Sequence, residues 1–456
     1  MSSNFCISTL CCVALTAAWY RPPAAASGLR FADVVKISGS ELAEFDGMAI
    51  DRLTMLACTA TACHPIPFQV DECDAAGRWV LDQGPMPTAD DPPGVVDAND
   101  LLLFMAADAG EHGVPGALPK GAPCAEVALR DPLDGTTRWA YLVAAADHRA
   151  PETYVAYDPA TDRVRGQHVT LGFADGVPGY LAVHRMPGDQ HVSELSNDTG
   201  RSRGSAEPSA GSSAGLVLGD GANLLDRFKV RASATFLFGL IHFSRSEADL
   251  RTQFMGWHTG PIRVVRGQRQ WVRLGWGIHS PTFGSYTYFY RDFAELPVGL
   301  YLNFKPTHFF GNILVQAILD FRDLRGWSLV VPSLPDPIPI DGNMTAQKTA
   351  LNELPDTWFA VVGPQMTLVQ SMDVSPSLAS VRRRLLYRET RHPEPPEAVA
   401  GAEPGIGYQL DQWEPVGAGA HQLASVAYAL PPDIDVRAFM RARGVPLEVS
   451  VHPLAR

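Results

Sequence analysis

Apolar and polar residues alternate over short distances along most of the chain, a pattern typical of half-buried β-strands rather than helices. Asp134-Gly135 stands between two such runs and predicts a tight hairpin, because glycine accepts the positive φ that the turn needs. The segment from Asp158 to Asp162 predicts a second turn of this kind. We therefore expect an antiparallel meander in the first half.

The second half is again strand-like, apart from one short segment with helical periodicity. Val436, Phe439 and Met440 fall on one helical face within residues 433–443, and Gly444 follows as a stop signal. The run 446–451 predicts a last strand. The main candidate strands before it lie at 231–244, 262–276, 286–292, 313–321 and 358–369.

A polar segment of small residues, 191–214, separates the two halves and buries too little apolar surface to hold one conformation. With 456 residues, two domains are the default expectation. We predict an all-β protein of two antiparallel β-sandwich domains, an N-terminal sandwich at 28–190 and a larger sandwich or supersandwich at 215–456. Segment 191–214 is the predicted flexible linker or loop.

The first 27 residues have the pattern of an export signal. Residues 6–19 form an apolar run too short to span a bilayer comfortably, and small residues follow at 22–27. The missing Lys or Arg before this run leaves an uncleaved anchor or a misassigned start as alternatives. We predict a signal peptide over 1–27, a periplasmic or extracellular protein, and no transmembrane segment beyond the signal.

Composition argues against several function classes. The formal net charge of -12 disfavours nucleic acid as a partner, because phosphate neutralisation needs a basic face. The sequence has no glycine-rich phosphate loop, no GxSxG elbow and no HExxH motif. We therefore expect no nucleotide cofactor and no zinc-dependent proteolysis.

Three of the seven cysteines lie within residues 1–27, which leaves an even number for an oxidising compartment. Three connectivities are open, and the preferred one joins Cys58 to Cys63 and Cys73 to Cys124. A cysteine pair followed directly by His64 is also how c-type haem is attached. Four residues separate these two cysteines rather than two, so haem is disfavoured.

Residues 64–112 are crowded with carboxylates between two apolar strand-like runs. Calcium takes six to eight hard oxygen ligands, which such a loop can supply, although the spacing is not that of an EF-hand. The alternative is that Asp and Asn serve as turn residues and keep exposed edges soluble. The candidate calcium ligands are Asp71, Glu72, Asp74, Asp97, Asn99 and Asp100.

Strand alternation in the segment 262–276 gathers arginines and one tryptophan on a single face. Guanidinium groups bind carboxylates in a fork and indole stacks on sugar rings, so this face suits an acidic sugar. The alternative is a solvated sheet face on which Arg stems cover apolar surface. Tyrosines at 286, 288 and 290 add aromatic density nearby. The candidate ligand-binding residues are Arg263, Arg269, Trp271, Arg273 and Tyr288.

Segments 65–71, 97–105, 224–229 and 260–266 resemble those of exported bacterial β-rich proteins of uncharacterised function. This resemblance covers most of the chain and brings no activity with it. More distantly, the order of Gln69-Val-Asp71, an acidic turn, an apolar strand and Gly260-Pro-Ile-Arg263 is similar to secreted galactose-mutarotase-like supersandwich proteins, some of which accompany polysaccharide lyases. The similarity implies a supersandwich fold, and no catalytic residue is carried over from it.

Two functions fit these observations. The first is an exported carbohydrate-interacting protein that binds or processes acidic glycans, with a polysaccharide or cell-surface glycan as partner. The alternative is a non-catalytic, calcium-stabilised structural or surface-assembly module. Geometry discriminates between them, because glycan binding at the predicted residues requires the arginine-rich strand and the tyrosine-rich strand to line one groove.

Overall fold

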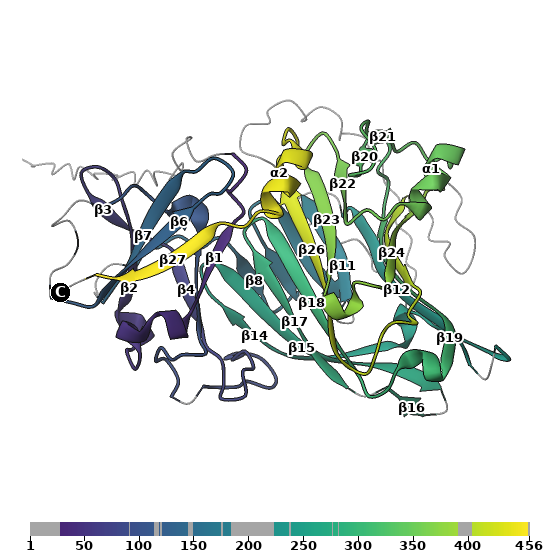
Figure 1. Ribbon diagram of the computed structural model, residues 1–456, viewed down its shortest axis with the longest axis horizontal. Coiled ribbons are helices and arrows are strands. Elements are labelled where there is room, and N and C mark those ends of the chain that lie inside the picture. Colours follow the sequence, from purple (N-terminus) through teal and green to yellow (C-terminus); the bar gives the residue numbers. More distant parts are fainter. Residues whose placement is uncertain are drawn as a thin grey trace, which may run out of the picture.

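Antiparallel strands make up nearly all of the regular structure, which confirms the all-β prediction (Figure 1). The predicted signal peptide and the predicted linker lie outside the described part of the chain. The computed structural model describes residues 28–90, 92–113, 118, 121–144, 149–174, 177–183, 223–236, 239–275, 277–280, 282–390 and 404–454.

Two sheets enclose the N-terminal core, a three-stranded sheet with the order β1-β5-β4 and a five-stranded sheet with the order β27-β6-β7-β2-β3. Phe45, Leu53, Phe104 and Val127 are fully buried in the cluster between them. The predicted hairpin at Gly135 joins β6 to β7. The strands are β1 (Val34–Ser38), β2 (Leu53–Cys58), β3 (Cys63–Ile66), β4 (Phe68–Asp71), β5 (Leu101–Met105), β6 (Cys124–Arg130), β7 (Thr137–Ala144) and β27 (Glu448–Pro453).

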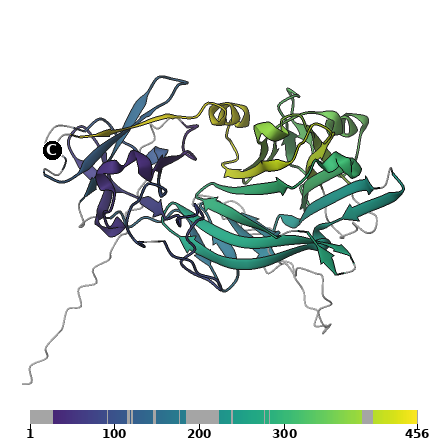
Figure 2. The ribbon, with the colours of Figure 1, turned by 60° about the horizontal axis from the view of Figure 1, so that its bottom comes forward.

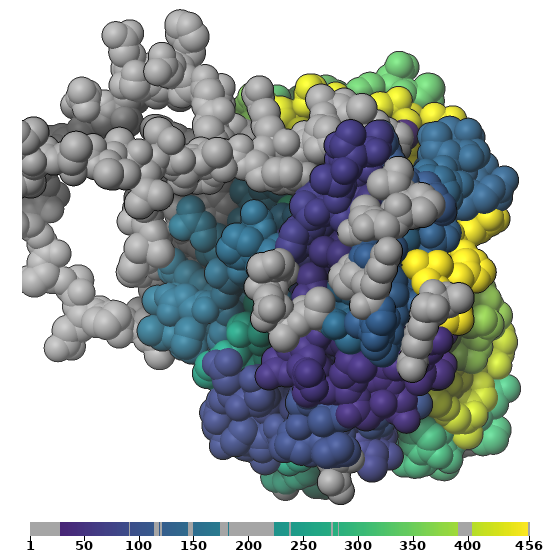
Figure 3. All heavy atoms as spheres, turned by 90° about the vertical axis from the view of Figure 1, so that its left-hand side faces the viewer, coloured from purple at the N-terminus to yellow at the C-terminus, as the bar shows by residue number. Residues whose placement is uncertain are grey.

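The C-terminal strand belongs to this N-terminal sandwich. β27 pairs with β6 from Glu448, opposite Arg130, to Pro453, opposite Ala125. Figure 3 shows yellow atoms of the C-terminal segment beside the blue atoms of the N-terminal half. The last strand predicted within the domain 215–456 therefore forms, but its assignment to that domain is corrected. The reason is that Val451 packs against the N-terminal core while the backbone of β27 completes the edge of β6.

A four-stranded sheet with the order β11-β10-β9-β8 follows. Val155 and Val164 are buried against Val264 and Phe289 of the second half. This sheet was expected in the sandwich at 28–190, and its apolar face instead covers β15 and β17. The predicted turn at 158–162 joins β8 to β9. The strands are β8 (Ala156–Asp158), β9 (Arg163–Arg165), β10 (Val169–Ala174) and β11 (Val177–Val183).

The largest sheet has ten strands in the order β14-β15-β17-β18-β26-β23-β22-β20-β21, with β16 paired to β15. All its recorded pairings are antiparallel. The strands are β14 (Leu250–Thr259), β15 (Arg263–Gly275), β16 (Ile278–His279), β17 (Phe283–Tyr290), β18 (Phe293–Leu302), β20 (Ser328–Val330), β21 (Ile338–Pro339), β22 (Trp358–Val362), β23 (Thr367–Val374) and β26 (Gly419–Leu430).

A five-stranded sheet with the order β13-β12-β19-β25-β24 closes the second sandwich. One face of this sheet enters the core: Leu385, Tyr387, Ile406 and Tyr408 are almost completely buried there. Because successive side chains point to opposite faces, the residues between them point outward. The strands are β12 (Leu225–Phe236), β13 (Ile241–Arg245), β19 (Phe310–Phe321), β24 (Arg382–Arg388) and β25 (Gly405–Asp411).

The described residues contain two α-helices, α1 (Ala346–Ala350) and α2 (Val436–Arg443). α2 is the predicted helix: Asp435 caps it through Ala438 N, Gly444 follows it, and Val436 and Phe439 are buried. Figures 1 and 2 place α2 between the N-terminal sandwich and the second half. The 3-10 segments are η1 (Gly39–Glu41), η2 (Ala43–Phe45), η3 (Ile50–Arg52), η4 (Ala106–Asp108), η5 (Glu247–Asp249), η6 (Pro306–His308), η7 (Leu351–Glu353) and η8 (Pro376–Leu378).

No helix within the described residues has both the length and the apolar character needed to cross a membrane.

Candidate functional site

Arg263, the first residue of the predicted ligand strip, is buried where the two halves meet. Its Nε donates to Asp71 Oδ2 and its Nη1 donates to Tyr290 Oη at 3.0 Å. The guanidinium carbon lies 4.7 Å from the ring centre of Trp79 and 4.6 Å from that of Tyr288. Arg263 therefore joins β4 to β15, and its side chain is only 1% exposed.

The remaining predicted strip residues differ in exposure. Tyr288 is half-buried and accepts a hydrogen bond from Trp79 Nε1 at 2.7 Å, whereas Arg269 and Arg273 are exposed and Trp271 is half-buried. The N-terminal half thus covers this face of β15 near Arg263 and leaves it exposed to solvent at Arg269 and Arg273. The structure thus does not bring the five predicted residues into one groove.

A second residue at this contact, His258, bridges two carboxylates. Its Nδ1 lies 3.0 Å from Asp82 Oδ1 and its Nε2 lies 3.4 Å from Asp71 Oδ1. Burial disfavours the imidazolium, but the hydrogen bonds to Asp71 and Asp82 outweigh it and raise the pKa of His258 to about 9. Burial also opposes ionisation of Asp71, yet Arg263 and His258 hold the pKa of that carboxyl below its usual value. These groups form a charged bridge between the halves.

The predicted calcium ligands divide among several roles. Asp71 faces Arg263 and His258, whereas Asp74 pairs with Arg78 at 2.7 Å. Glu72 accepts a hydrogen bond from Gly94 N, and Asn99 Nδ2 donates to Asp74 O at 3.2 Å. The six predicted ligands therefore do not surround one point.

A smaller acidic group includes two of the predicted ligands. Ligand oxygens of Asp90, Asp97 and Asp100 lie within 4.8 Å of one another. Burial and the neighbouring carboxylates Asp97 and Asp90 raise the pKa of Asp100 to about 6, against hydrogen bonds from Asp97 N and Cys73 N. Calcium binding by this stretch stays a prediction.

One of the two predicted disulfides is present in the structure. Cys58 and Cys63 form a disulfide at the end of the β2–β3 hairpin, so their sulfurs are not available to haem. Cys73 and Cys124 are both free thiols, which corrects the predicted second disulfide. They lie in different surroundings: Cys73 N donates to Asp100, while the Cys124 side chain packs with Leu56 and Tyr141. Burial raises the pKa of Cys73 to about 12 and that of Cys124 to about 11.

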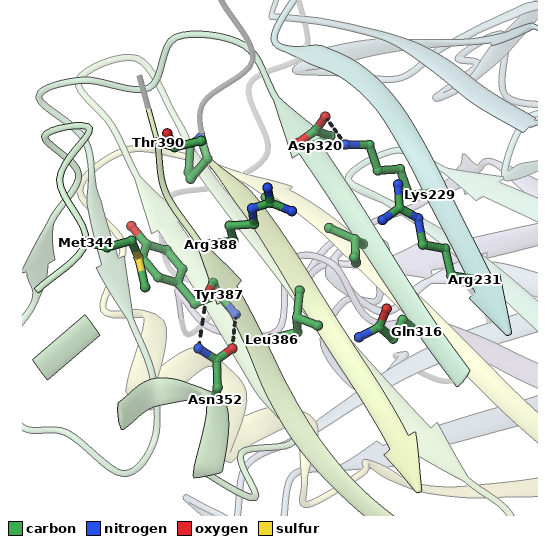
Figure 4. Close-up of a pocket in the computed structure, with 13 residues that line it drawn as sticks. Lys229, Arg231, Gln316, Asp320, Met344, Asn352, Leu386, Tyr387, Arg388 and Thr390 are labelled. Atoms are coloured by element: carbon green, nitrogen blue, oxygen red, sulfur yellow. Dashed lines mark hydrogen bonds and ion pairs between the residues drawn. The ribbon is translucent and has the colours of Figure 1, made fainter. Parts of the chain in front are cut away.

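A cleft lies elsewhere among the described residues, on the outward face of the five-stranded sheet (Figure 4). We call it the β12–β24 cleft; its volume is about 370 Å³. Lys229 and Arg231 border it from β12, and Arg388 borders it from β24. Its lining residues are Lys229, Arg231, Gln316, Ile318, Asp320, Met344, Asn352, Leu386, Tyr387, Arg388, Thr390, Pro404 and Gly405.

Strand register explains why the sheet is hollowed here. Gly405 stands between Asp320 of β19 and Arg388 of β24, and Gly407 stands between Ile318 and Leu386 in the next row. Neither glycine contributes a side chain to this face. The larger side chains on either side therefore form walls, and β25 forms the floor between them.

Basic side chains predominate among the described residues that line the cleft. These residues include three basic side chains and one carboxylate, a net formal charge of +2, whereas the whole chain carries -12. The carboxylate, Asp320, lies 2.7 Å from Lys229 Nζ. Burial raises the pKa of Asp320, although Lys229 acts in the opposite direction. The arrangement favours an anionic ligand, with Ile318 and Leu386 offering apolar contact.

One wall of the cleft is fixed by hydrogen bonds between the side-chain amide of Asn352 and the backbone of β24. Asn352 Nδ2 donates to Tyr387 O at 3.1 Å, and Asn352 Oδ1 accepts from Tyr387 N at 2.8 Å. The amide thus acts as a strand neighbour for the edge of β24. Leu385 N donates to Leu354 O at 2.9 Å, which adds a second partner along the edge of β24.

The loop that carries Met344 is fixed by a buried charge network. Glu389, which is 2% exposed, accepts hydrogen bonds from Lys348 Nζ at 2.7 Å, Tyr387 Oη at 2.6 Å and Asp341 N at 2.6 Å. Lys348 Nζ also lies 2.6 Å from Asp341 Oδ1. These bonds hold the loop after β21 beside the cleft, where Met344 is 40% exposed.

Sequence reasoning missed this cleft because its walls come from strands far apart in the chain. Two local signals were present: the pair Gly405 and Gly407, two positions apart, and the alternation of Lys229 and Arg231. Neither signal identifies the neighbouring strand. The order β12-β19-β25-β24 alone brings them together.

No protein-family model matches the chain, and no curated protein matches it. Among solved structures, 11 chains match. An α-mannosidase from Enterococcus faecalis V583 is 7% identical, with a TM-score of 0.45 over 93% of this chain and 44% of that one. A protein in glycosyl hydrolase family 38 from Enterococcus faecalis is 8% identical, with a TM-score of 0.43 over 93% and 46%.

A heparan sulfate lyase from Pedobacter heparinus is 11% identical, with a TM-score of 0.23 over 45% of this chain and 28% of that one. This chain thus spans less than half of the length of each of these three proteins.

Proposed function

We propose that the protein binds an acidic carbohydrate in the β12–β24 cleft. One observation carries the proposal: Lys229, Arg231 and Arg388 surround a cleft of about 370 Å³ in a chain of net charge -12. Guanidinium groups bind carboxylate or sulfate through paired hydrogen bonds. The apolar side chains of Ile318 and Leu386 can contact the C–H face of a sugar ring, as the stems of long side chains do.

Binding fits the cleft better than glycoside hydrolysis. Hydrolysis of a glycosidic bond generally uses two carboxyl groups on opposite sides of the bond. Asp320 is the one carboxylate among the described residues that line the cleft, and Lys229 already contacts it. The proposed role is therefore recognition of a polysaccharide or cell-surface glycan.

The proposed location is outside the cytoplasm. Disulfides persist mainly in oxidising compartments, and the Cys58–Cys63 bond closes the β2–β3 hairpin. A periplasmic or extracellular site would also give the cleft access to acidic glycans.

The test is calorimetric titration of the protein with oligogalacturonate and with a neutral glucan oligosaccharide of equal length. We expect measurable binding of the oligogalacturonate alone, weakened by added salt because the contacts are ionic. Arg388→Gln removes one charge-assisted contact, worth about 1.5–3 kcal/mol, and should weaken binding about tenfold or more.

The matched control is Arg382→Gln, which removes an exposed arginine from the same strand; this arginine pairs with Asp411 at 2.7 Å, outside the cleft. It should leave the affinity unchanged. Equal binding of both sugars, or equal loss in the two variants, would overturn the proposal. Thermal unfolding with and without EDTA tests the calcium prediction separately: a lower midpoint in EDTA supports bound calcium, because a ligand specific to the folded state raises the midpoint.

A further inference from the structure

Large apolar side chains are exposed mainly in one part of the second half. Nine large hydrophobic side chains are exposed among the described residues, and six of them fall between residues 240 and 309. Leu240 is 83% exposed and Tyr301 is 72% exposed. Scattered exposed apolar residues are common, but a concentration of this kind marks an interaction surface.

Strand pairing brings most of these side chains to one place. Phe236 of β12 pairs with both Ile241 of β13 and Phe310 of β19. Leu240 precedes Ile241 and Phe309 precedes Phe310. Both residues therefore lie just beyond the same end of the three paired strands. The rings of Phe236 and Phe310 lie 5.7 Å apart beneath them.

The connection from β18 to β19 adds further aromatic surface at this end. Phe304 and Phe309 pack edge to face, with ring centres 5.0 Å apart, and are 45% and 53% exposed. In Figure 1 this end, labelled β16 and β19, lies away from the N-terminal strands β6 and β7. We call the exposed set the apolar tip; it consists of Leu240, Ile241, Phe304 and Phe309.

The sequence around the apolar tip lacks acidic residues. Residues 236–246 and 296–311 contain no Asp or Glu, although the chain has 49 acidic residues and a net charge of -12. Lys305 lies between Phe304 and Phe309 in the second of these segments. The sequence thus places a cation and no carboxylate next to the exposed aromatic side chains.

We propose that the apolar tip docks on a lipid bilayer that contains anionic lipids. Aromatic and aliphatic side chains enter the boundary between headgroups and acyl chains, while nearby Lys and Arg are attracted to anionic headgroups. The side chains of the tip project from the β12–β13 and β18–β19 connections, which suits shallow insertion into the headgroup region of a bilayer. The absence of carboxylates from both segments removes the charges that an anionic surface would repel.

Flotation with vesicles tests the proposal on the full chain. We expect the protein to bind phosphatidylcholine vesicles with 30 mol% phosphatidylglycerol about tenfold or more tightly than vesicles of phosphatidylcholine alone, with loss of binding in high salt. The double variant Leu240→Ser, Phe309→Ser should lower the partition coefficient at least about tenfold, because it removes two side chains that would be buried in lipid. Lys305→Glu should reduce binding to the anionic vesicles only.

The control variant is Leu133→Ser, because Leu133 is 51% exposed in the N-terminal hairpin, away from the apolar tip. Circular dichroism of each variant verifies folding. Equal vesicle binding by wild type and the tip variant would overturn the proposal. So would sedimentation that shows a wild-type dimer abolished by the tip variant, since the tip would then bind a second copy. Oligogalacturonate titration of the tip variant keeps this result separate from the cleft proposal, because the tip residues do not line the cleft.

Discussion

At the scale of single residues, the charged bridge between the halves contributes to the pH dependence of stability. His258 is held between Asp71 and Asp82, and Asp71 also binds Arg263. Each of these groups would be costly to bury alone, because a charge removed from water needs a partner. Their mutual contacts offset that cost and join β4 to β14 and β15.

We expect stability to fall as the pH rises above neutrality. The folded protein holds the His258 proton more tightly than the unfolded chain, with a pKa of about 9 against the ordinary 6.5. This contribution is complete below about pH 6.5 and is lost as the pH rises through 9. On linkage grounds the unfolding free energy should drop on the order of 2 kcal/mol between pH 6.5 and 9.5. Urea unfolding at a series of pH values measures it.

His258→Gln provides the comparison. The variant should be less stable than wild type at pH 6.5, and its stability should change less between pH 6.5 and 9.5. A variant with the same pH slope as wild type would show that another group is responsible.

At the scale of elements, glycines allow the N-terminal half to lie directly on β14 and β15. A Cβ at Gly256 would come within 2.2 Å of Gln83 O, and a Cβ at Gly260 within 2.2 Å of the Gln69 side chain. A Cβ at Gly267 would come within 2.3 Å of Leu81 Cδ1. The missing side chains let the segment after β4 approach the sheet, and this approach buries Arg263.

Gly267→Ala should weaken this contact. The added methyl group must displace Leu81, and overpacking of this kind typically costs about 1–3 kcal/mol. Thermal unfolding should therefore show a lower midpoint. Gly284→Ala is the matched control on neighbouring β17, because a Cβ there meets nothing within 4 Å. Equal midpoints for both variants would contradict the close packing at Gly267.

The same elements show what the sequence could predict. Local turn signals such as Gly135 and the helix with Val436 and Phe439 were correct, because neighbouring residues determine them. Alternation also placed Arg263 and Arg269 on one face of β15, but it does not tell which part of that face another sheet covers. The β12–β24 cleft likewise depends on β25 lying between β19 and β24, a non-local pairing that periodicity does not encode.

At the scale of the whole molecule, the described chain is closed by contacts between its two ends. Arg30 donates to Asp131 Oδ1 at 2.6 Å and to Ala442 O, in the last turn of α2, at 2.7 Å. β27 then pairs with β6. The N-terminal sandwich is thus built from both ends of the described sequence.

Removal of the residues after Val445 should therefore destabilise the N-terminal sandwich selectively. Without β27, the edge of β6 loses its strand partner and the core loses Val451. Hydrogen exchange read by mass spectrometry should show lost protection over 124–144 and retained protection over β22 and β23. Val449→Ser, a change at a residue 39% exposed in the same strand, should preserve both regions. Unchanged protection over 124–144 in the truncated chain would refute this expectation.

The pairing of β27 with β6 also determines when the N-terminal sandwich can be completed during synthesis. Arg130 and Glu448, which face each other across these strands with an ion pair at 2.6 Å, are 318 positions apart in the sequence. On the ribosome, or in a channel that passes the chain from its N-terminus, β6 emerges early and its partner emerges near the end. The half of the protein that is made first is therefore completed last.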